Sequence, residues 1–277
     1  MESPYFSIII PALNEEKYIS GLLKSLINQT YKEFEVILVD GMSADKTVSV
    51  FKKFQNKLPR SQYLVADKKN VSYQRNLGGK KATGKYLIFF DADVKVNPTF
   101  LEEVHLASLK QKFSLATTWI EPDSEKTADR IMLLLANIGQ EVYKIVNRPF
   151  SGGYNTIVTK KVFLKLNGFR EMNINEDHDF AIRAFKKKIE TIILPEPKVI
   201  FSLRRFRSEG TLNVLRKYAH AAIYAMLKGP VIYEMFEYRM GGHVHKRRRK
   251  KINFVKINTY IKTIEKLENN LNKLLRV

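Results

Sequence analysis

Two aspartates separated by one residue, Asp91 and Asp93, directly follow the apolar run 86–90 of this 277-residue chain. An unpaired carboxylate within a packed strand is costly, so charges at this point need a partner. Carboxylate oxygens suit Mg²⁺ and Mn²⁺, and Mg²⁺ is commonly held by one or two carboxylates together with substrate phosphates. The pair therefore predicts a Mg²⁺ or Mn²⁺ site. An acidic loop before a helix that starts near Pro98 is the alternative explanation.

The surrounding sequence alternates between strand-like and helical patterns. Apolar runs at 6–10 and 34–39 each end in polar residues, at 11–15 and 40–43. Between the runs, apolar residues recur at helical spacing. The first predicted helix opens at Asn14 as its N-cap, and its apolar face is Ile19, Leu22, Leu23, Leu26 and Ile27. The second has Val48, Phe51 and Phe54 on one face, and the third spans 71–81. This order predicts a mostly parallel sheet with helices on both faces, and ligands bind outside the carboxyl ends of such strands.

The second half of the chain is less regular. The predicted strands are 114–120, 154–158 and two short ones, 192–194 and 199–201, separated by prolines. The predicted helices are 128–146 and one opening at Glu176, with Phe180, Ala184 and Phe185 on its apolar face.

The composition limits the function classes. The net charge of +20 favours an anionic partner, such as nucleic acid, lipid headgroups or phosphorylated small molecules, although a lysine-rich proteome would have the same effect. The absence of cysteine excludes disulfides and thiolate metal sites. No signal peptide is recognisable, and no apolar run reaches the roughly 18 residues of a membrane span. We therefore expect a chain that does not span the bilayer.

Several motifs together resemble those of family-2 glycosyltransferases. In chain order they are Pro11-Ala-Leu-Asn-Glu15-Glu16, Val39–Thr47, Arg75–Gly79, Ala82–Gly84, Phe90–Asp93, Gly152-Gly153-Tyr154 and Glu176–Phe180. They cover roughly the first 200 residues, and their order is more specific than any single motif. The resemblance implies an α/β, Rossmann-like GT-A fold, a nucleotide-diphospho-sugar donor, and inverting transfer assisted by a divalent cation.

The resemblance also implies roles for individual residues. The nucleotide-sugar-binding residues would be Pro11, Ala12, Leu13, Asn14, Glu15, Asp40, Gly41, Ser43, Arg75, Gly79, Asp91 and Ala92. Asp91 and Asp93 would serve the ribose and the metal, and Asp177 would be the catalytic base. Gly152, Gly153, Tyr154 and Glu176 would lie on the acceptor side. Leu13 replaces an aromatic residue common in relatives, which leaves the nucleotide base open.

The chemistry of the acceptor decides how much a base contributes. A hydroxyl must lose its proton as it attacks, and a carboxylate suits that task. At a helix start Asp177 is expected to remain ionised, and it could instead only stabilise the helix. A lipid-phosphate acceptor is already anionic and would need cations, which Arg204, Arg205 and Arg207 could supply; a solvated basic turn is the alternative explanation of these arginines.

The composition becomes basic and amphipathic after residue 203. We therefore predict a GT-A domain at 1–203 and a basic helical extension at 204–277. An apolar helical face is expected from Leu212, Leu215, Ala219, Ala222, Ile223, Met226 and Leu227. The six basic residues Lys246–Lys251 favour an anionic membrane surface, and no aromatic residues interrupt the run as stacking on nucleic acid would require.

The sequence thus favours a cytoplasmic enzyme, peripheral on the inner face of the cell membrane, with a lipid-linked or saccharide acceptor and no nucleic-acid partner. Packing of the extension on the core is an alternative, and a short heptad pattern (Tyr260, Ile264, Leu267, Leu271, Leu274) makes oligomerisation possible. Two non-catalytic alternatives stay open: an RNA- or membrane-binding protein on a GT-A-like scaffold, and a donor-binding scaffold without turnover.

Overall fold

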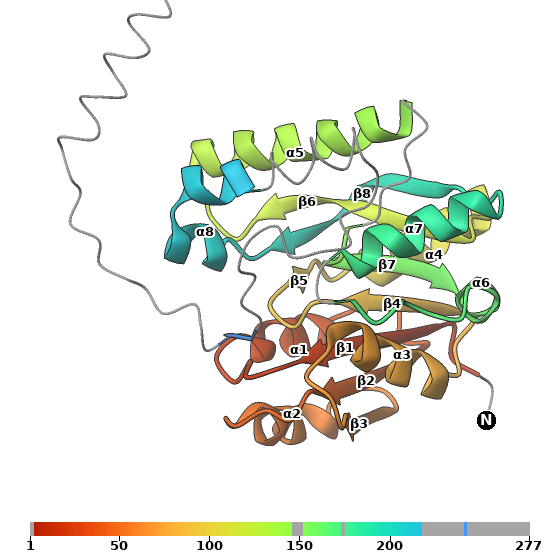
Figure 1. Ribbon diagram of the computed structural model, residues 1–277. Helices are drawn as coiled ribbons and strands as arrows, with labels where there is room; N and C mark the ends of the chain where they lie inside the picture. The colour runs from red at the N-terminus through yellow and green to blue at the C-terminus, as the bar shows by residue number, and fades with distance from the viewer. Residues whose placement is uncertain (1–2, 146–151, 173–174, 218–240, 243–277) are drawn as a thin grey trace, which may run out of the picture. The chain divides into compact units, whose positions relative to one another are not determined.

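The computed structural model describes residues 3–145, 152–172, 175–217 and 241–242, all within the unit Met1–His245. The predicted basic run 246–251 and the heptad pattern lie outside the described residues. Figure 1 shows the helices and strands. The strands are β1 (Phe6–Ala12), β2 (Phe34–Asp40), β3 (Ser61–Val65), β4 (Tyr86–Phe90), β5 (Lys95–Val96), β6 (Leu115–Pro122), β7 (Asn155–Thr159) and β8 (Thr191–Phe201). The helices are α1 (Ile19–Ile27), α2 (Thr47–Gln55), α3 (Val71–Lys81), α4 (Phe100–Gln111), α5 (Thr127–Ile145), α6 (Lys160–Lys165), α7 (Glu176–Lys186) and α8 (Arg204–Glu209).

The strands form one mixed sheet in the order β3-β2-β1-β4-β7-β6-β8-β5. The first four in that order are parallel, as expected for strands joined by crossover helices, whereas β7 is antiparallel to both β4 and β6. Ala12 is the register partner of Asp40, and β4 runs parallel to β1. The three polar clusters therefore lie at the same edge of the sheet, as the sequence predicts.

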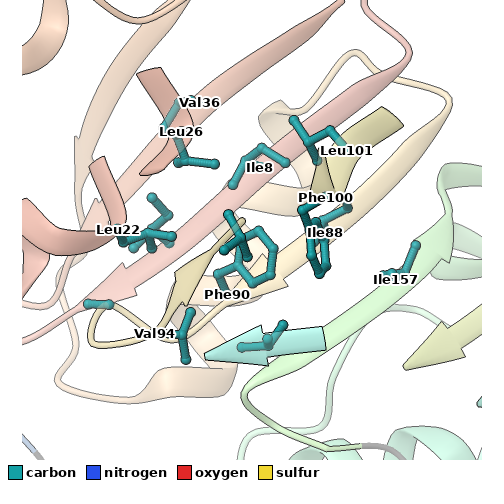
Figure 2. Close-up of a cluster of buried hydrophobic side chains, with 14 of the residues drawn as sticks. Ile8, Leu22, Leu26, Val36, Ile88, Phe90, Val94, Phe100, Leu101 and Ile157 are labelled. Carbon is teal, nitrogen blue, oxygen red and sulfur yellow. The ribbon is translucent and has the colours of Figure 1, made fainter. Parts of the chain in front are cut away.

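Alternating side chains of the central strands build a core on each face of the sheet. Ile8 and Ile10 of β1 belong to one core, while Ile9 between them belongs to the other. Figure 2 shows the first core, where Leu22 and Leu26 of α1 and Phe100 and Leu101 of α4 meet Ile8, Ile88 and Phe90 of the sheet. Buried residues of α6 and α7 contribute to the second core. Helices therefore cover both faces, as predicted.

The predicted helix start at Asn14 is wrong. Helix α1 begins at Ile19, four residues after Glu15, the predicted first helical residue, and Tyr18 is its N-cap. Asn14 instead has a φ of 54°, in the left-handed region where asparagine is tolerated. Its side chain accepts a hydrogen bond from the backbone N–H of Ala44 in the loop after β2 (2.7 Å), so it joins two loops rather than capping a helix.

Three expectations for the second half also need correction. The two short strands predicted around the prolines are one strand, β8, which has a cis Glu196–Pro197 bond and pairs with β6 across a register shift. Phe185 is exposed, and Ala181 is buried beside Phe180 and Ala184. In the described part of the region after α8, Leu212 is 80% exposed and Val214 is buried in the core, so the predicted apolar face does not hold there.

Two helical glycines provide a matched test of the packing between α3 and the sheet. A Cβ on Gly78 of α3 would lie 2.5 Å from a methyl of Ile9, whereas one on Gly139 of α5 meets nothing within 4 Å. Overpacking costs about 1–3 kcal/mol. Removing glycine from an open helix position gains about 0.5–1 kcal/mol. We expect urea unfolding to show that Gly78→Ala destabilises the protein and Gly139→Ala stabilises it; equal effects would contradict this close approach.

Candidate active site

The loops after β1 and β2 are joined by hydrogen bonds around Asp40. The Asp40 Oδ2 accepts from the Ser43 N–H (3.0 Å), and the Ser43 Oγ accepts from the Asn14 N–H (2.8 Å). Asp40 is 3% exposed, and its Oδ1 has no hydrogen-bond partner among the described residues. A buried acceptor without a partner is costly. The N–H group of a bound ligand would satisfy it.

The Gln74 side chain of α3 links the ends of β1 and β2. Its amide Nε2 donates to the carbonyl oxygens of Ala12 (2.9 Å) and Val39 (2.7 Å). A Cβ on Gly41 would lie 3.0 Å from the same amide group, so glycine allows this close approach. Gln74 was not among the predicted site residues, although it directly precedes the Arg75–Gly79 motif, which was the one signal that could have found it.

Arg75 connects the end of β4 to the segments that the sequence places on the acceptor side. Its side chain is 2% exposed and pairs with Glu176 and, at 3.0 Å, with Asp91. It also donates to the Gly153 carbonyl oxygen at 2.7 Å. The ion pair with Glu176 spans 101 residues of sequence, and it joins α3 to the start of α7.

Asp177 lies beside this arginine and next to the Gly152–Tyr154 segment. A Cβ on Gly153 would be 3.0 Å from the Asp177 Oδ2, so glycine leaves room for the carboxylate. The backbone N–H groups at the helix start favour the ionised form of Asp177, as expected, but they are not the largest influence on its pKa. Burial raises the pKa of Asp177 above its usual value, and it outweighs the lowering by Arg75 and by the backbone N–H groups. A raised pKa suits a general base working near neutral pH.

Arg204 lies on the other side of the aspartate pair. Its Nε forms an ion pair with the Asp93 Oδ2 at 2.8 Å, and its two terminal nitrogens donate hydrogen bonds to the two oxygens of Glu15 at 2.5 and 2.8 Å. The guanidinium also lies 4.5 Å from the ring centroid of Tyr18. This cluster brings together the loop after β1, the end of β4 and the first residue of α8.

Carboxylates outnumber arginines in this group. Burial, together with the nearby charges of Asp93 and Asp91, raises the pKa of Glu15 to about 7, against the lowering by Arg204. The pKa of Asp91 is raised to about 6 by desolvation and, to a smaller extent, by the charges of Asp93 and Glu176, whereas the charge of Arg75 lowers it. The Asp91 side chain is 40% exposed. Additional positive charge would therefore stabilise the group at neutral pH.

The raised pKa of Glu15 predicts a pH dependence of stability. The folded state binds more protons than the unfolded state between the usual pKa of 4.5 and about 7, so the Glu15 contribution is lost as the pH rises through this window. The shift corresponds to about 3 kcal/mol. We expect the free energy of unfolding of the wild type, relative to Glu15→Gln, to fall by up to this amount between pH 4.5 and 8. A difference that stays flat with pH would contradict the raised pKa.

The carboxylates at the end of β4 match the ligand chemistry of Mg²⁺ and Mn²⁺ in part. The Asp93 side chain is 14% exposed, its Oδ2 is paired with Arg204, which a cation would have to replace, and its carboxylate also has a hydrogen bond with the Ser202 side chain. Among the described residues, no three His, Asp or Glu side chains are grouped to hold one ion. Because Mg²⁺ is commonly bound by one or two carboxylates plus substrate phosphates, Asp91 and Asp93 fit such an ion when a phosphorylated ligand completes the set.

The structure does not bring every predicted site residue to this group. Gly79 packs in the core, where a Cβ would lie 2.5 Å from the Phe163 ring. Arg207 turns to Asp123, and the charge of Arg205 acts on Asp93. The Tyr154 hydroxyl accepts a hydrogen bond from the Gln140 amide at 2.8 Å. Pro11, Ala12 and Ala92 are buried, the Ala12 carbonyl oxygen accepts from the Gly41 N–H at 2.8 Å, and the Leu13 carbonyl oxygen accepts from the Gly242 N–H at 3.2 Å.

Comparison with protein families shows to which family this chain belongs. The family described as Glycosyl transferase family 2 matches residues 7–166. The chain belongs to this family. It is 29% identical over 215 residues to the poly(ribitol-phosphate) beta-N-acetylglucosaminyltransferase TarS of Staphylococcus aureus, covering 72% of this chain and 36% of TarS. An uncharacterized glycosyltransferase of Haemophilus influenzae is 34% identical, covering 78% of this chain and 90% of that protein. The chain thus spans about a third of the length of TarS.

Solved structures agree on the fold. The structure of S. aureus TarS 1–349 in complex with UDP-GlcNAc matches with a TM-score of 0.60 and 22% identity, covering 71% of this chain and 58% of that one. The mannosyltransferase PcManGT from Pyrobaculum calidifontis, in complex with GDP-Man and Mn²⁺, also has a TM-score of 0.60, at 17% identity, covering 80% and 65%. These structural likenesses confirm the GT-A fold that the sequence predicts for this chain.

Proposed function

We propose that this family-2 chain transfers a sugar from a nucleotide-diphospho-sugar to an acceptor, with inversion at the sugar. The observation that carries the proposal is the convergence of Asp40, Arg75, Asp91, Asp93 and Asp177 at one edge of the sheet. The buried, unmatched oxygen of Asp40 would accept an N–H of the nucleobase. Asp91 and Asp93 would hold Mg²⁺ or Mn²⁺, which, when bound, supplies positive charge at the diphosphate.

Asp177 would act as the base in this proposal. Its carboxylate lies beside Gly153 and close to the Arg75 guanidinium. There it would take the proton of an acceptor hydroxyl as the oxygen attacks the sugar carbon and the bond to the diphosphate breaks. A direct displacement by the acceptor inverts the configuration at the sugar carbon. Arg75 would hold Asp91 and the Gly153 carbonyl in place without taking part in proton transfer.

A thermal-shift screen tests the donor site. A ligand that binds only the folded state raises its stability with the logarithm of ligand concentration over Kd. We expect UDP or GDP, and the corresponding sugar nucleotides, to raise the Tm in the presence of Mn²⁺, and Asp40→Asn to weaken the preference among nucleobases. If no nucleotide shifted the Tm with or without Mn²⁺, a non-catalytic basic binding protein would be the better explanation.

The acceptor we propose is lipid-linked, with the enzyme peripheral on the inner face of the cell membrane. The net charge of +20 and the run Lys246–Lys251 support this proposal, and each basic residue near an anionic surface contributes roughly 1 kcal/mol. A related archaeal protein is named for a dolichyl-phosphate-linked acceptor: the dolichyl N-acetyl-alpha-D-glucosaminyl phosphate 3-beta-D-2,3-diacetamido-2,3-dideoxy-beta-D-glucuronosyltransferase of Methanococcus voltae. Among the described residues, no helix is long and apolar enough to cross a bilayer.

Vesicle sedimentation tests this location. Replacing Lys246–Lys251 with glutamine is expected to weaken binding to vesicles that contain anionic lipid, and to leave the weak binding to neutral vesicles unchanged. Anionic-vesicle binding that persists at the wild-type level would rule out this run as the membrane contact.

A further inference from the structure

Arg204 occupies the place where positive charge is needed at the aspartate pair. Two of its nitrogens donate hydrogen bonds to the Glu15 carboxylate, and the third, Nε, forms an ion pair with Asp93. The Arg204, Glu15 and Asp93 side chains are 15%, 7% and 14% exposed, so solvent screens these contacts only weakly. A guanidinium stays protonated under all ordinary conditions, and its planar fork matches a carboxylate by two parallel bonds, as it does here with Glu15.

We propose that Arg204 is the resident counter-ion of Asp93, and that a divalent cation binds Asp93 by replacing the Arg204 guanidinium beside the Asp93 Oδ2. The proposal rests on the proposed donor site and adds an exchange between an arginine and a metal ion to it. The reason is geometric: an oxygen with a guanidinium nitrogen only 2.8 Å away cannot coordinate a cation on the same side.

The surrounding contacts confine this exchange to the Arg204 side chain. The rest of α8 is anchored, because Phe206 is buried in the core and Arg207 pairs with Asp123. The backbone N–H of Leu203 also donates to Asp123 at 3.1 Å. Arg204 keeps both bonds to Glu15 when it releases Asp93, so the guanidinium stays at the site while its Nε–H becomes available.

The released Nε–H faces a defined class of ligand. Guanidinium groups bind phosphate oxygens with the same charge-assisted geometry that they use for carboxylates. Arg204 would therefore contact the diphosphate of a donor that arrives with the metal ion. In this account Arg204 holds the site together without metal and adds a contact to the diphosphate when the metal is present.

Binding of Mn²⁺ without nucleotide tests the exchange. Free Mn²⁺ is measured by electron paramagnetic resonance during titration of the full chain, for the wild type, Arg204→Gln and Arg204→Lys. Removing a competing buried cation should tighten Mn²⁺ binding by roughly tenfold or more in Arg204→Gln. Arg204→Lys should fall between the two, because an ammonium cannot span Asp93 and Glu15 together.

Arg207→Gln is the matched control. Arg207 lies on the same helix and also pairs with an aspartate, but that aspartate is Asp123, outside the Asp93 cluster. Its Mn²⁺ affinity should equal that of the wild type. If Arg204→Gln bound Mn²⁺ no more tightly than Arg207→Gln, Arg204 would not compete for Asp93 and the inference would be wrong.

A measurement on the unaltered protein covers the case in which Arg204→Gln fails to fold. In a sample with ¹⁵N-labelled arginine side chains, the Nε–H signal of Arg204, assigned by its absence in Arg204→Lys, should shift as Mg²⁺ is added. A signal that stays constant at saturating Mg²⁺ would overturn the exchange. Nucleotide binding is measured separately by the thermal shift, so failure of the exchange and failure of the donor site give different results.

Discussion

Asp177→Asn should lower the rate of sugar transfer to a hydroxyl acceptor by about 10²- to 10⁴-fold, the usual contribution of general base catalysis. Asparagine has nearly the same shape as aspartate but cannot accept the acceptor proton. The donor-side contacts of Asp40, Asp91 and Asp93 do not involve this side chain, so the Kd for the donor should stay nearly unchanged. The measurement is steady-state transfer together with calorimetric donor binding.

The pH profile separates a base from a structural acid. Because the pKa of Asp177 is raised, the wild-type kcat/KM should decline on the acid side as this carboxylate becomes protonated. The residual activity of Asp177→Asn should lack that decline. Near-normal turnover in Asp177→Asn would rule out Asp177 as a required base and would favour an acceptor that is already anionic.

Arg75→Lys should be the most destabilising single change in the site. The arginine is 2% exposed and connects Glu176, Asp91 and the Gly153 carbonyl, and a lysine ammonium cannot reach all three. Breaking a buried ion pair by altering one partner costs about 3–5 kcal/mol. We expect a loss of this order in urea unfolding and, in whatever fraction remains folded, transfer too slow to detect.

Arg183→Lys is the matched control for Arg75→Lys. Arg183 is also largely buried, pairs with Asp179 at 2.7 Å and donates to two carbonyl oxygens, but none of these partners is a predicted site residue. It should lose stability and retain transfer activity. Equal activity losses in both variants would mean that Arg75 acts only through stability.

The sequence predicts the first half of the fold well because local patterns there coincide with tertiary contacts. The apolar runs of β1, β2 and β4 are buried along their whole length, so a run of strand length is an unambiguous signal. Pattern and packing disagree at Asn14, whose side chain joins two loops, and at β8, which continues through its prolines. Both depend on partners from other parts of the chain.

The sequence predicts several of the residues that gather at the candidate site, but not the ion pairs that they form. The motifs predict Asp91 and Asp93 at a strand end and Asp177 at the start of a helix, and the structure has them at the end of β4 and in the first turn of α7. The partners of these carboxylates are distant in sequence: Glu176 pairs with Arg75 and Glu15 pairs with Arg204, 189 residues away. Periodicity carries no information about contacts of this range. The sequence therefore predicts an acceptor-side role for Arg204 but not its pairing with Glu15, and that role stays a prediction.

Release of nucleoside diphosphate from sugar nucleotides tests the central claim most directly. The wild type would be incubated with UDP- and GDP-sugars and Mn²⁺, with water or added saccharide and lipid-linked acceptors, and the released UDP or GDP would be quantified. We expect one nucleotide class to be turned over by the wild type, and release to be lost in Asp93→Ala. Release by Asp93→Ala at the wild-type rate, or binding of nucleotide with no release for any donor and acceptor, would contradict a sugar transfer carried out at the carboxyl ends of β1, β2 and β4.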